Sequence, residues 1–226
     1  MIVTPAFLSK LAGAPVNANM VSTISGLVMQ PVGLDRPHRL AHYLGQLAHE
    51  SGCWKYDREI WGPTPAQTRY DTRTDLGNTA ALDGDGYRFR GRGPIQITGR
   101  ANYAGFTAWC RKFNPSAPDF TASPDAVVTD PWEGLGPIWY WDTRKINKLA
   151  DAGDITAVTK CINGGTNGLT DRIRLTVAAS LFLSGSADAK SFQRAHGLKA
   201  DGMIGPITRS VLHKALTGQP VVTFAL

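Results

Sequence analysis

Two glutamates flank a short aromatic-rich bend in the segment LAHESGCWKYDREIWGP, residues 47–63. Glu50 lies in the last turn of an expected helix, where the negative helix end and apolar neighbours such as Trp54 favour a protonated carboxyl. Glu59 lies in the polar stretch KYDRE, where a carboxylate more easily stays ionised. Two carboxyls in contrasting environments are what acid/base cleavage of a glycosidic bond requires. The alternative is that Glu59 is a solvated partner of a nearby arginine.

A second candidate segment is RFRGRGPIQITGRANY, residues 88–103. Its alternation predicts an extended strand with Gln96 and Thr98 on one face, suited to hydrogen bonding with sugar hydroxyls or to holding a water molecule. A phosphate loop is excluded because no Lys-Ser/Thr pair follows the glycines and the segment leads into a strand. A third segment, CINGGTNGLTDRIR, places Asn163 before two glycines and Arg172 at the beginning of a helix.

The sequence predicts no metal site and no cofactor. His42 and His49 lie seven positions apart on the expected helix without an HExxH pattern, which favours structural roles. Asp83 and Asp85 resemble a calcium loop only in part, because the downstream glutamate is missing, so we expect a plain turn.

The sequence predicts mainly helical elements around these candidate residues. Thr4 and Pro5 predict the beginning of a short N-terminal helix, and Gly52 the end of the helix that holds Glu50. Glycine, aspartate, proline and threonine are frequent over 61–93, which predicts turns with one short β-like stretch over 87–89. Helical spacing returns over residues 103–110, 138–141, 153–162 and 171–183.

The remaining sequence divides the chain into parts. The small, polar stretch SGSADAK predicts a linker over 184–190, after a main domain over 1–183. Residues 191–216 predict two short helices around a DGxxG turn, too few to form a core alone, so we expect this appendage to pack on another part. The tail, 217–226, shows no usable pattern.

Charge and cysteine content limit the classes of partner. The 24 Lys+Arg and 18 Asp+Glu give a net charge of +6, which suits an anionic partner, but no long run of like charges indicates nucleic acid. Three widely spaced cysteines, Cys53, Cys110 and Cys161, predict free thiols, with one disulfide and a leftover thiol as the alternative. No apolar run approaches the roughly 18 residues of a membrane span, and no signal-peptide pattern begins the chain. We therefore expect cytoplasmic synthesis without stable membrane insertion.

Four segments occur in a telling order: AHESG, GRGPIQITGRANY, SPDAVVTDPWEGLGPIWYW and INGGTNGLTDRI. Together they resemble the successive signatures of glycoside hydrolase family 19, the chitinase family, and their spacing is most similar to its compact bacteriophage endolysins. The resemblance spans roughly residues 5–183. It implies a lysozyme-like fold: a mainly α (α+β), bilobal domain with a small extended insert, followed here by the helical appendage.

The resemblance also implies roles for individual residues. Glu50 would be the general acid and Glu59 the general base that activates a water, which Thr98 helps to hold. Arg172 would orient Glu59 through a charge pair. The family inverts the anomeric centre, which fits carboxyls roughly 6.5–9.5 Å apart. The residues implied to line the sugar-binding cleft are Gln96, Asn102, Tyr103 and Asn163.

Two departures from the plant chitinases bear on these assignments. The segment between the two glutamates is shorter here, which makes the position of Glu59 less secure than that of Glu50, and the several disulfides are absent. Shortened loops suggest an open cleft that accepts the peptide-bearing strands of peptidoglycan.

The appendage resembles the second half of a peptidoglycan-binding domain in its segment FQRAHGLKADGMIGPIT. Phe192 and Asp201 are its candidate wall-binding residues, although packing and turn formation would explain them equally. A wall-binding motif beside this domain favours peptidoglycan over chitin.

The expected function is therefore that of a monomeric endolysin that hydrolyses the β-1,4 bond between N-acetylmuramic acid and N-acetylglucosamine. Its partner would be the peptidoglycan glycan strand, reached in the periplasm after holin-dependent release from the host cytoplasm. The alternatives are a chitinase and an inactive cell-wall-binding protein.

Overall fold

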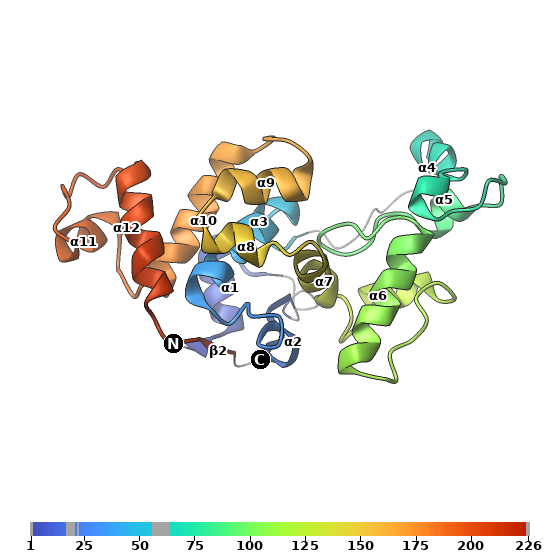
Figure 1. The fold of residues 1–226 in the computed structure, drawn as a ribbon, viewed down its shortest axis with the longest axis horizontal. Helices are drawn as coiled ribbons and strands as arrows, with labels where there is room; N and C mark the ends of the chain where they lie inside the picture. Colours follow the sequence, from blue (N-terminus) through green and yellow to red (C-terminus); the bar gives the residue numbers. More distant parts are fainter. Residues whose placement is uncertain (1, 17–20, 22, 56–63, 225–226) are drawn as a thin grey trace.

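The computed structural model describes residues 2–16, 21, 23–55 and 64–224. Figure 1 shows three parts along the long axis: a central helical body, a second lobe and a C-terminal appendage. The body holds α1 (Pro5–Ala12), α2 (Gly26–Met29), α3 (Pro37–Glu50), α8 (Asn147–Asp151), α9 (Ile155–Asn163) and α10 (Leu169–Leu183). The second lobe holds α4 (Pro65–Tyr70), η2 (Thr74–Leu76), α5 (Asp85–Arg88), α6 (Arg100–Phe113) and η3 (Pro124–Val128), and α7 (Leu135–Thr143) lies between body and lobe.

The helix pair α3 and α10 forms the centre of the body. Pro37 occupies the first position of α3, where its fixed φ suits a helix start, and the helix ends at Glu50 just before Gly52 in the left-handed region. The two helices approach closely at Gly45, where an added Cβ would lie 2.6 Å from both Cα and N of Thr176. Glycine is needed here because any side chain would meet the backbone of α10.

The second lobe corrects one prediction. The β-like stretch over 87–89 is instead the end of α5, and Asp85, which follows the bend at residues 83–84, also forms a buried ion pair that the sequence did not predict. Asp85 is 2% exposed, and its Oδ1 lies 2.6 Å from Nη2 of Arg100 at the start of α6. The pair ties α5 to α6, which short-range sequence patterns could not show because the partners are fifteen positions apart.

The expected strand over residues 95–98 is also wrong. The segment forms a tight turn closed by an isolated antiparallel bridge between Arg92 and Ile97. Gln96 has φ 57°, in the left-handed region, so Gln96 and Thr98 do not share the face of a strand. The Gly93-Pro94 pair explains the turn, since Gly93 has φ 77° and proline fixes its own φ.

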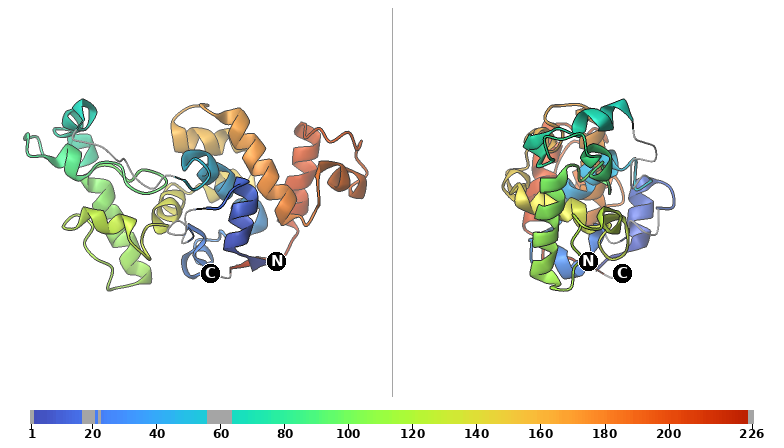
Figure 2. Two further views of the ribbon diagram at one scale, coloured as in Figure 1. Left: turned by 180° about the vertical axis from the view of Figure 1, so that it is seen from behind. Right: turned by 90° about the vertical axis from the view of Figure 1, so that its right-hand side faces the viewer.

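The chain ends are paired, which the sequence did not predict. β1 (Ile2–Val3) and β2 (Thr223–Phe224) form a two-stranded parallel sheet, with Val3 opposite Phe224. The backbone N–H of Val222 also donates to the carbonyl of Asp35 at 2.8 Å. The last residues therefore return to the N-terminal side of the body, and both ends of the chain lie together (Figures 1 and 2).

The appendage consists of α11 (Ala189–Ala195) and α12 (Pro206–Thr217), and α12 packs against α3 and α10. Phe192 is fully buried and stacks on His196, with ring centroids 4.0 Å apart. The Asp201 carboxylate accepts hydrogen bonds from the backbone N–H of Met203 and from Gln193. These contacts give Phe192 a packing role and Asp201 a turn role, and their wall-binding role stays a prediction.

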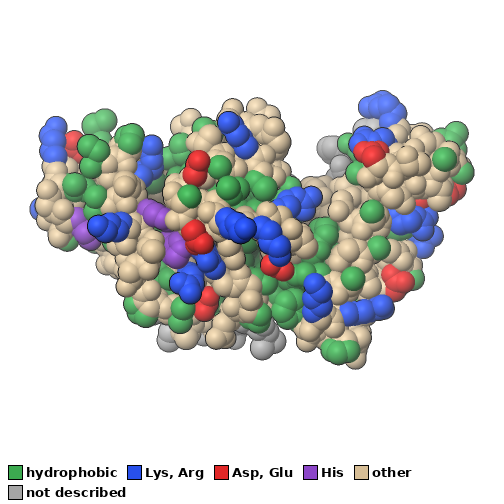
Figure 3. Space-filling model, viewed as in Figure 1, with side chains coloured by type: hydrophobic (Ala, Val, Ile, Leu, Met, Phe, Trp, Pro, Cys, Tyr) green, Lys and Arg blue, Asp and Glu red, His purple; other side chains and the backbone are tan. Residues whose placement is uncertain are grey.

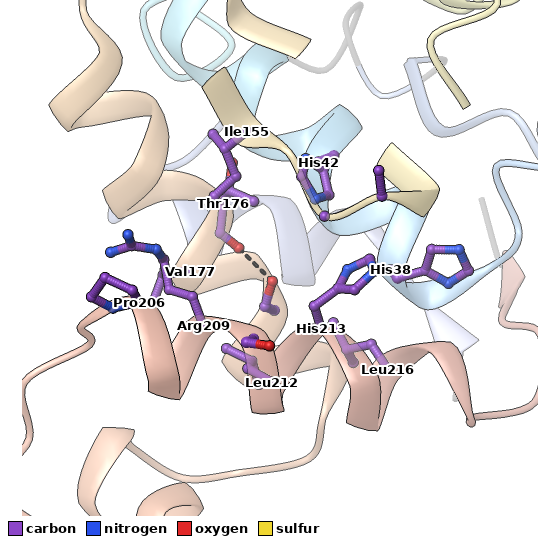
Figure 4. A pocket seen from close by; sticks show the side chains of 14 residues that line it. His38, His42, Ile155, Thr176, Val177, Pro206, Arg209, Leu212, His213 and Leu216 are labelled. Atoms are coloured by element: carbon purple, nitrogen blue, oxygen red, sulfur yellow. Dashed lines mark hydrogen bonds between the residues drawn. The ribbon is translucent and has the colours of Figure 1, made fainter. Parts of the chain in front are cut away.

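A cavity of about 290 Å³ separates α12 from α3 and α10 (Figure 4). His213 of α12 faces His38 and His42 of α3 there, with ring centroids 5.5 and 6.1 Å apart. His38 Nε2 donates to Asp151 Oδ1 at 2.9 Å, and His213 Nε2 donates to the Asp151 carbonyl at 3.0 Å. His38 and His42 therefore have structural surroundings, as the sequence predicted for His42.

The three cysteines Cys53, Cys110 and Cys161 are free thiols, as expected. Burial raises the pKa of Cys110 to about 12, which leaves it an inert thiol. Within the described residues, no helix is long and apolar enough to cross a membrane.

The first prediction concerns the helix crossing at Gly45. Gly45→Ala should lower the free energy of unfolding by about 1–3 kcal/mol, because the overpacking cost exceeds the helix propensity that alanine gains. Gly205→Ala is the matched control, since an added Cβ there meets nothing within 4 Å. Urea unfolding measures both, and equal stability of the two variants would contradict the close crossing.

The second prediction concerns pH. Burial, with His213 and His38 nearby, lowers the pKa of His42 to about 3. The folded protein keeps His42 neutral while the unfolded chain takes up a proton below about pH 6.5, so this contribution to stability is complete above that pH and is lost as pH falls toward 3. Between pH 7 and pH 5 the loss from His42 alone should be about 2 kcal/mol.

His42→Leu should flatten this part of the pH dependence, as measured by urea unfolding at each pH. His196→Asn is the control, because His196 is exposed and should leave the slope unchanged. A wild-type slope in His42→Leu would show that another group is responsible.

Candidate active site

Glu50 is the last residue of α3, and its carboxylate points onto the first turns of α10. Its Oε1 accepts a hydrogen bond of 2.6 Å from Nη2 of Arg172. The Arg172 side chain is 1% exposed and that of Glu50 is 28% exposed, so a buried cation holds a partly open carboxylate. The other two nitrogens of Arg172 donate to Oε1 of Gln46 at 2.6 Å and to the carbonyl of Asn167 at 3.2 Å.

Arg172 pairs with Glu50, a contact that the sequence did not predict. Glu59 lies outside the described residues, so its role as general base and its expected charge pair with Arg172 stay predictions.

A second pair links the same two helices beside the first. His49 Nδ1 and Asp171 Oδ2 lie 2.8 Å apart, and Arg174 Nη2 lies 2.8 Å from Asp171 Oδ1. The hydrogen bond from His49, with that from Arg174, holds the pKa of Asp171 below its ordinary value. His49 therefore has a structural role, as predicted, in fixing the end of α3 on α10.

The polar residues of the turn between α5 and α6 form a separate group. The Thr98 hydroxyl donates to the carbonyl of Gln96 at 3.1 Å, and the Asn102 amide donates to the carbonyl of Thr98 at 2.7 Å. Gln96 is exposed, while Thr98 and Asn102 are half-buried. These three side chains are available to a ligand at the surface of the turn.

Tyr103 is not available in this way. It is fully buried, and its hydroxyl donates to the carbonyl of Arg90 at 2.8 Å and accepts from Nη1 of Arg92 at 2.6 Å. Burial raises its pKa to about 12. The prediction that Tyr103 lines the cleft is therefore wrong, and Tyr103 packs the lobe beneath the turn.

Helix α7 brings the two groups toward each other. Gly136 packs on Ile97 of the turn, since an added Cβ would lie 3.0 Å from its Cδ1. One turn further along α7, the Tyr140 hydroxyl donates to the carbonyl of Ile162 at 3.2 Å. Burial raises the pKa of Tyr140 above its ordinary value.

Asn163 follows directly as the last residue of α9, exposed and next to Gly164 in the left-handed region. In Figures 1 and 2 the turn between α5 and α6 extends from the second lobe toward the helical body. Figure 3 shows the surface hollowed between body and lobe, with Lys and Arg side chains gathered beside the hollow. Glu50, Asn163, and Gln96 and Thr98 of the turn are among the predicted site residues whose side chains are at least partly exposed in the structure.

Sequence reasoning missed Gln46 and Tyr140. Gln46 lies four positions before Glu50, so the two occupy the same face of the helix, and this spacing was the available signal. The role of Tyr140 had no local signal, because its partner Ile162 is more than twenty positions away. Among the described residues, no group of three or more His, Cys, Asp or Glu side chains is arranged to hold a metal ion.

Comparison with known proteins agrees with this picture. No protein-family model matches the chain. It is 41% identical over 101 residues to a glycosyl hydrolase family 19 domain-containing protein of Haemophilus influenzae, covering 44% of this chain and 45% of that protein. It is 34% identical over 127 residues to an endochitinase of Arabidopsis thaliana, covering 56% of this chain and 39% of that protein. The chain thus spans less than half the length of these curated relatives.

Solved structures show the same fold. Chitinase C from Streptomyces griseus superposes with a TM-score of 0.61 at 18% identity, covering 80% of this chain and 92% of that one. A class IV family 19 chitinase from Zea mays gives a TM-score of 0.54 at 17% identity, covering 80% and 92%. The predicted mainly helical, lysozyme-like fold of family 19 chitinases is therefore confirmed. The chain is thus similar over about half of its length to glycosyl hydrolase family 19 sequences, and it has the fold of family 19 chitinases.

The third prediction concerns Arg172. Arg172→Lys keeps the charge but cannot reach Gln46, Glu50 and the Asn167 carbonyl together, so the free energy of unfolding should fall by about 1–3 kcal/mol. The control is Arg174→Lys, because that side chain is 65% exposed and its ion pair is solvated. It should change stability by less than about 0.5 kcal/mol. Urea unfolding measures the stability of both variants. An equal loss of stability in the two would contradict the role of Arg172 as a buried donor to three acceptors.

Proposed function

We propose that this protein is an inverting glycoside hydrolase that cleaves the β-1,4 bond between N-acetylmuramic acid and N-acetylglucosamine in peptidoglycan. The observation that supports it most is the placement of Glu50. Its carboxylate is held by a buried guanidinium at the end of α3, yet remains partly exposed. A fixed, accessible carboxyl is what proton transfer to a leaving oxygen needs.

In this mechanism Glu50 donates a proton to the glycosidic oxygen, and a water attacks the opposite face of the sugar. A bound glycan would cover the exposed part of Glu50 and remove the water that stabilises its charge, which favours the protonated form needed by an acid. Thr98 and Gln96 would hold the attacking water from the turn, and Glu59 would accept its proton. Asn102 and Asn163 would bind sugar groups on the two sides.

Peptidoglycan is proposed as the substrate on two observations. The net charge of +6 suits an anionic cell wall, and the appendage carries half of a peptidoglycan-binding pattern. The second candidate is chitin, which is favoured by the relatives and structural neighbours that are chitinases. The third is an inactive wall-binding protein, against which the Glu50–Arg172 arrangement argues.

The proposed setting is that of a phage endolysin. A monomer made in the host cytoplasm would reach the wall in the periplasm after holin-dependent release, and lysis would follow. This setting rests on the resemblance of the ordered motifs to compact endolysins.

The fourth prediction tests the acid. Glu50→Gln should lower the rate of glycan cleavage by about 10²–10⁴-fold, because the amide cannot donate an acidic proton. Folding should be retained, since the amide oxygen still accepts from Arg172. Asp75→Asn is the control, because Asp75 is an exposed carboxylate paired with Arg73 in the second lobe.

The same assay decides the substrate. Purified sacculi and chitin oligomers are digested separately, and the products are identified by mass spectrometry. Muropeptides from sacculi with a new reducing end support the proposal, whereas cleavage of chitin oligomers alone would replace it with a chitinase. Full activity of Glu50→Gln would refute the assignment of the acid.

A further inference from the structure

A chain of buried hydrogen bonds lies behind Glu50. Thr159 of α9, Gln46 of α3 and Arg172 of α10 are 0%, 1% and 1% exposed. The Gln46 amide donates from Nε2 to Oγ1 of Thr159 at 3.0 Å and accepts at Oε1 from Nη1 of Arg172 at 2.6 Å. Arg172 then donates from Nη2 to Glu50 at 2.6 Å. The chain runs from the core to the proposed acid without an exposed member before Glu50.

The direction of each hydrogen bond in this chain is determined. The Thr159 hydroxyl donates its proton to the carbonyl of Ile155 at 2.8 Å, so toward Gln46 it can only accept. The amide nitrogen of Gln46 must therefore face Thr159, and the amide oxygen must face Arg172. A flipped amide would place its N–H₂ group against the guanidinium and leave two donors facing each other.

We propose that Gln46 is a positioning residue for Glu50 that acts through Arg172. Gln46 accepts a hydrogen bond from Nη1 of Arg172 and so fixes the plane of the guanidinium. In this orientation Nη2 points at Oε1 of Glu50. The Gln46 amide is neutral and forms no ion pair with Arg172. The ion pair between Arg172 and Glu50 therefore has no competing carboxylate at this position. The Glu50 side chain is 28% exposed, so its carboxylate keeps access to a ligand. The inference rests on the proposed role of Glu50 as the acid.

Two substitutions of Gln46 test separately its hydrogen bonds to Arg172 and Thr159 and the absence of charge on its side chain. Gln46→Met keeps a similar volume but removes both hydrogen bonds, so Arg172 loses its anchor. The rate constant kcat should fall about 10- to 100-fold with KM changed by less than about 2-fold, since misplacing a catalytic group costs chemistry rather than binding. Gln46→Glu adds a carboxylate that competes for Arg172.

The Gln46→Glu variant should shift the alkaline limb of the pH–rate profile to higher pH. The added negative charge disfavours a second ionised carboxylate nearby, so the proposed acid keeps its proton to a higher pH than in the wild type. Thr159→Val is a milder variant that removes the acceptor for Nε2. Thr159→Val should also lower kcat, by a smaller factor than Gln46→Met. It replaces Gln46→Met in this test if that variant does not fold.

Ser180→Ala is the matched control, because Ser180 is buried on α10 and its hydroxyl donates to the carbonyl of Thr176, away from Gln46, Arg172 and Glu50. It should leave kcat, KM and the pH profile unchanged per folded molecule. Wild-type kcat and pH profile in the Gln46 variants, at whatever stability, would overturn the inference and leave Gln46 a packing residue.

A structural readout keeps this test independent of the proposed function. A crystal structure of Gln46→Met should show Glu50 turned away from Arg172, and an intact 2.6 Å contact would overturn the inference. If the wild type cleaves neither sacculi nor chitin, the proposed function fails. The crystal structure then still decides whether Gln46 holds the Arg172–Glu50 contact.

Discussion

The pairing of α3 with α10 depends on the buried cation Arg172. Arg172 carries its charge into the core of the body at 1% exposure, and an unpaired guanidinium there would be strongly destabilising. Its three nitrogens are satisfied by Gln46 and Glu50 of α3 and by the backbone ahead of α10. The need to satisfy Arg172 therefore fixes α3 against α10 and, in the same contacts, fixes the carboxylate that we propose as the acid.

Packing makes this pairing possible. The close approach of the helices at Gly45 brings the end of α3 within reach of the first turns of α10. Helix α7 then connects this pair to the second lobe, through Gly136 against the turn and Tyr140 against the end of α9. The turn at Ile97 and the end of α9 are thus both contacted by one helix whose own side chains are largely buried.

The C-terminal part packs against the body. α12 packs on α3 and α10 around three histidines, and β2 pairs with β1 at the start of the chain. The contact with α12 and the proposed acid lie on the same helix, because His42 precedes Glu50 by two turns of α3. The appendage therefore contributes to the surroundings of the helix that presents the proposed acid.

The sequence by itself indicated the longer helices, such as α3 with its end before Gly52, because helix periodicity and terminators act over a few residues. It misassigned the turn at Gln96 and the buried Tyr103, and it did not show the contact between Arg172 and Glu50. Only the tertiary structure decided these, since each depends on contacts with residues distant in the chain: Ile97 with Gly136, Tyr103 with the carbonyl of Arg90, and Arg172 with Glu50, 122 positions away. Local patterns specify which face of a helix is buried, but not which charge meets which across the core.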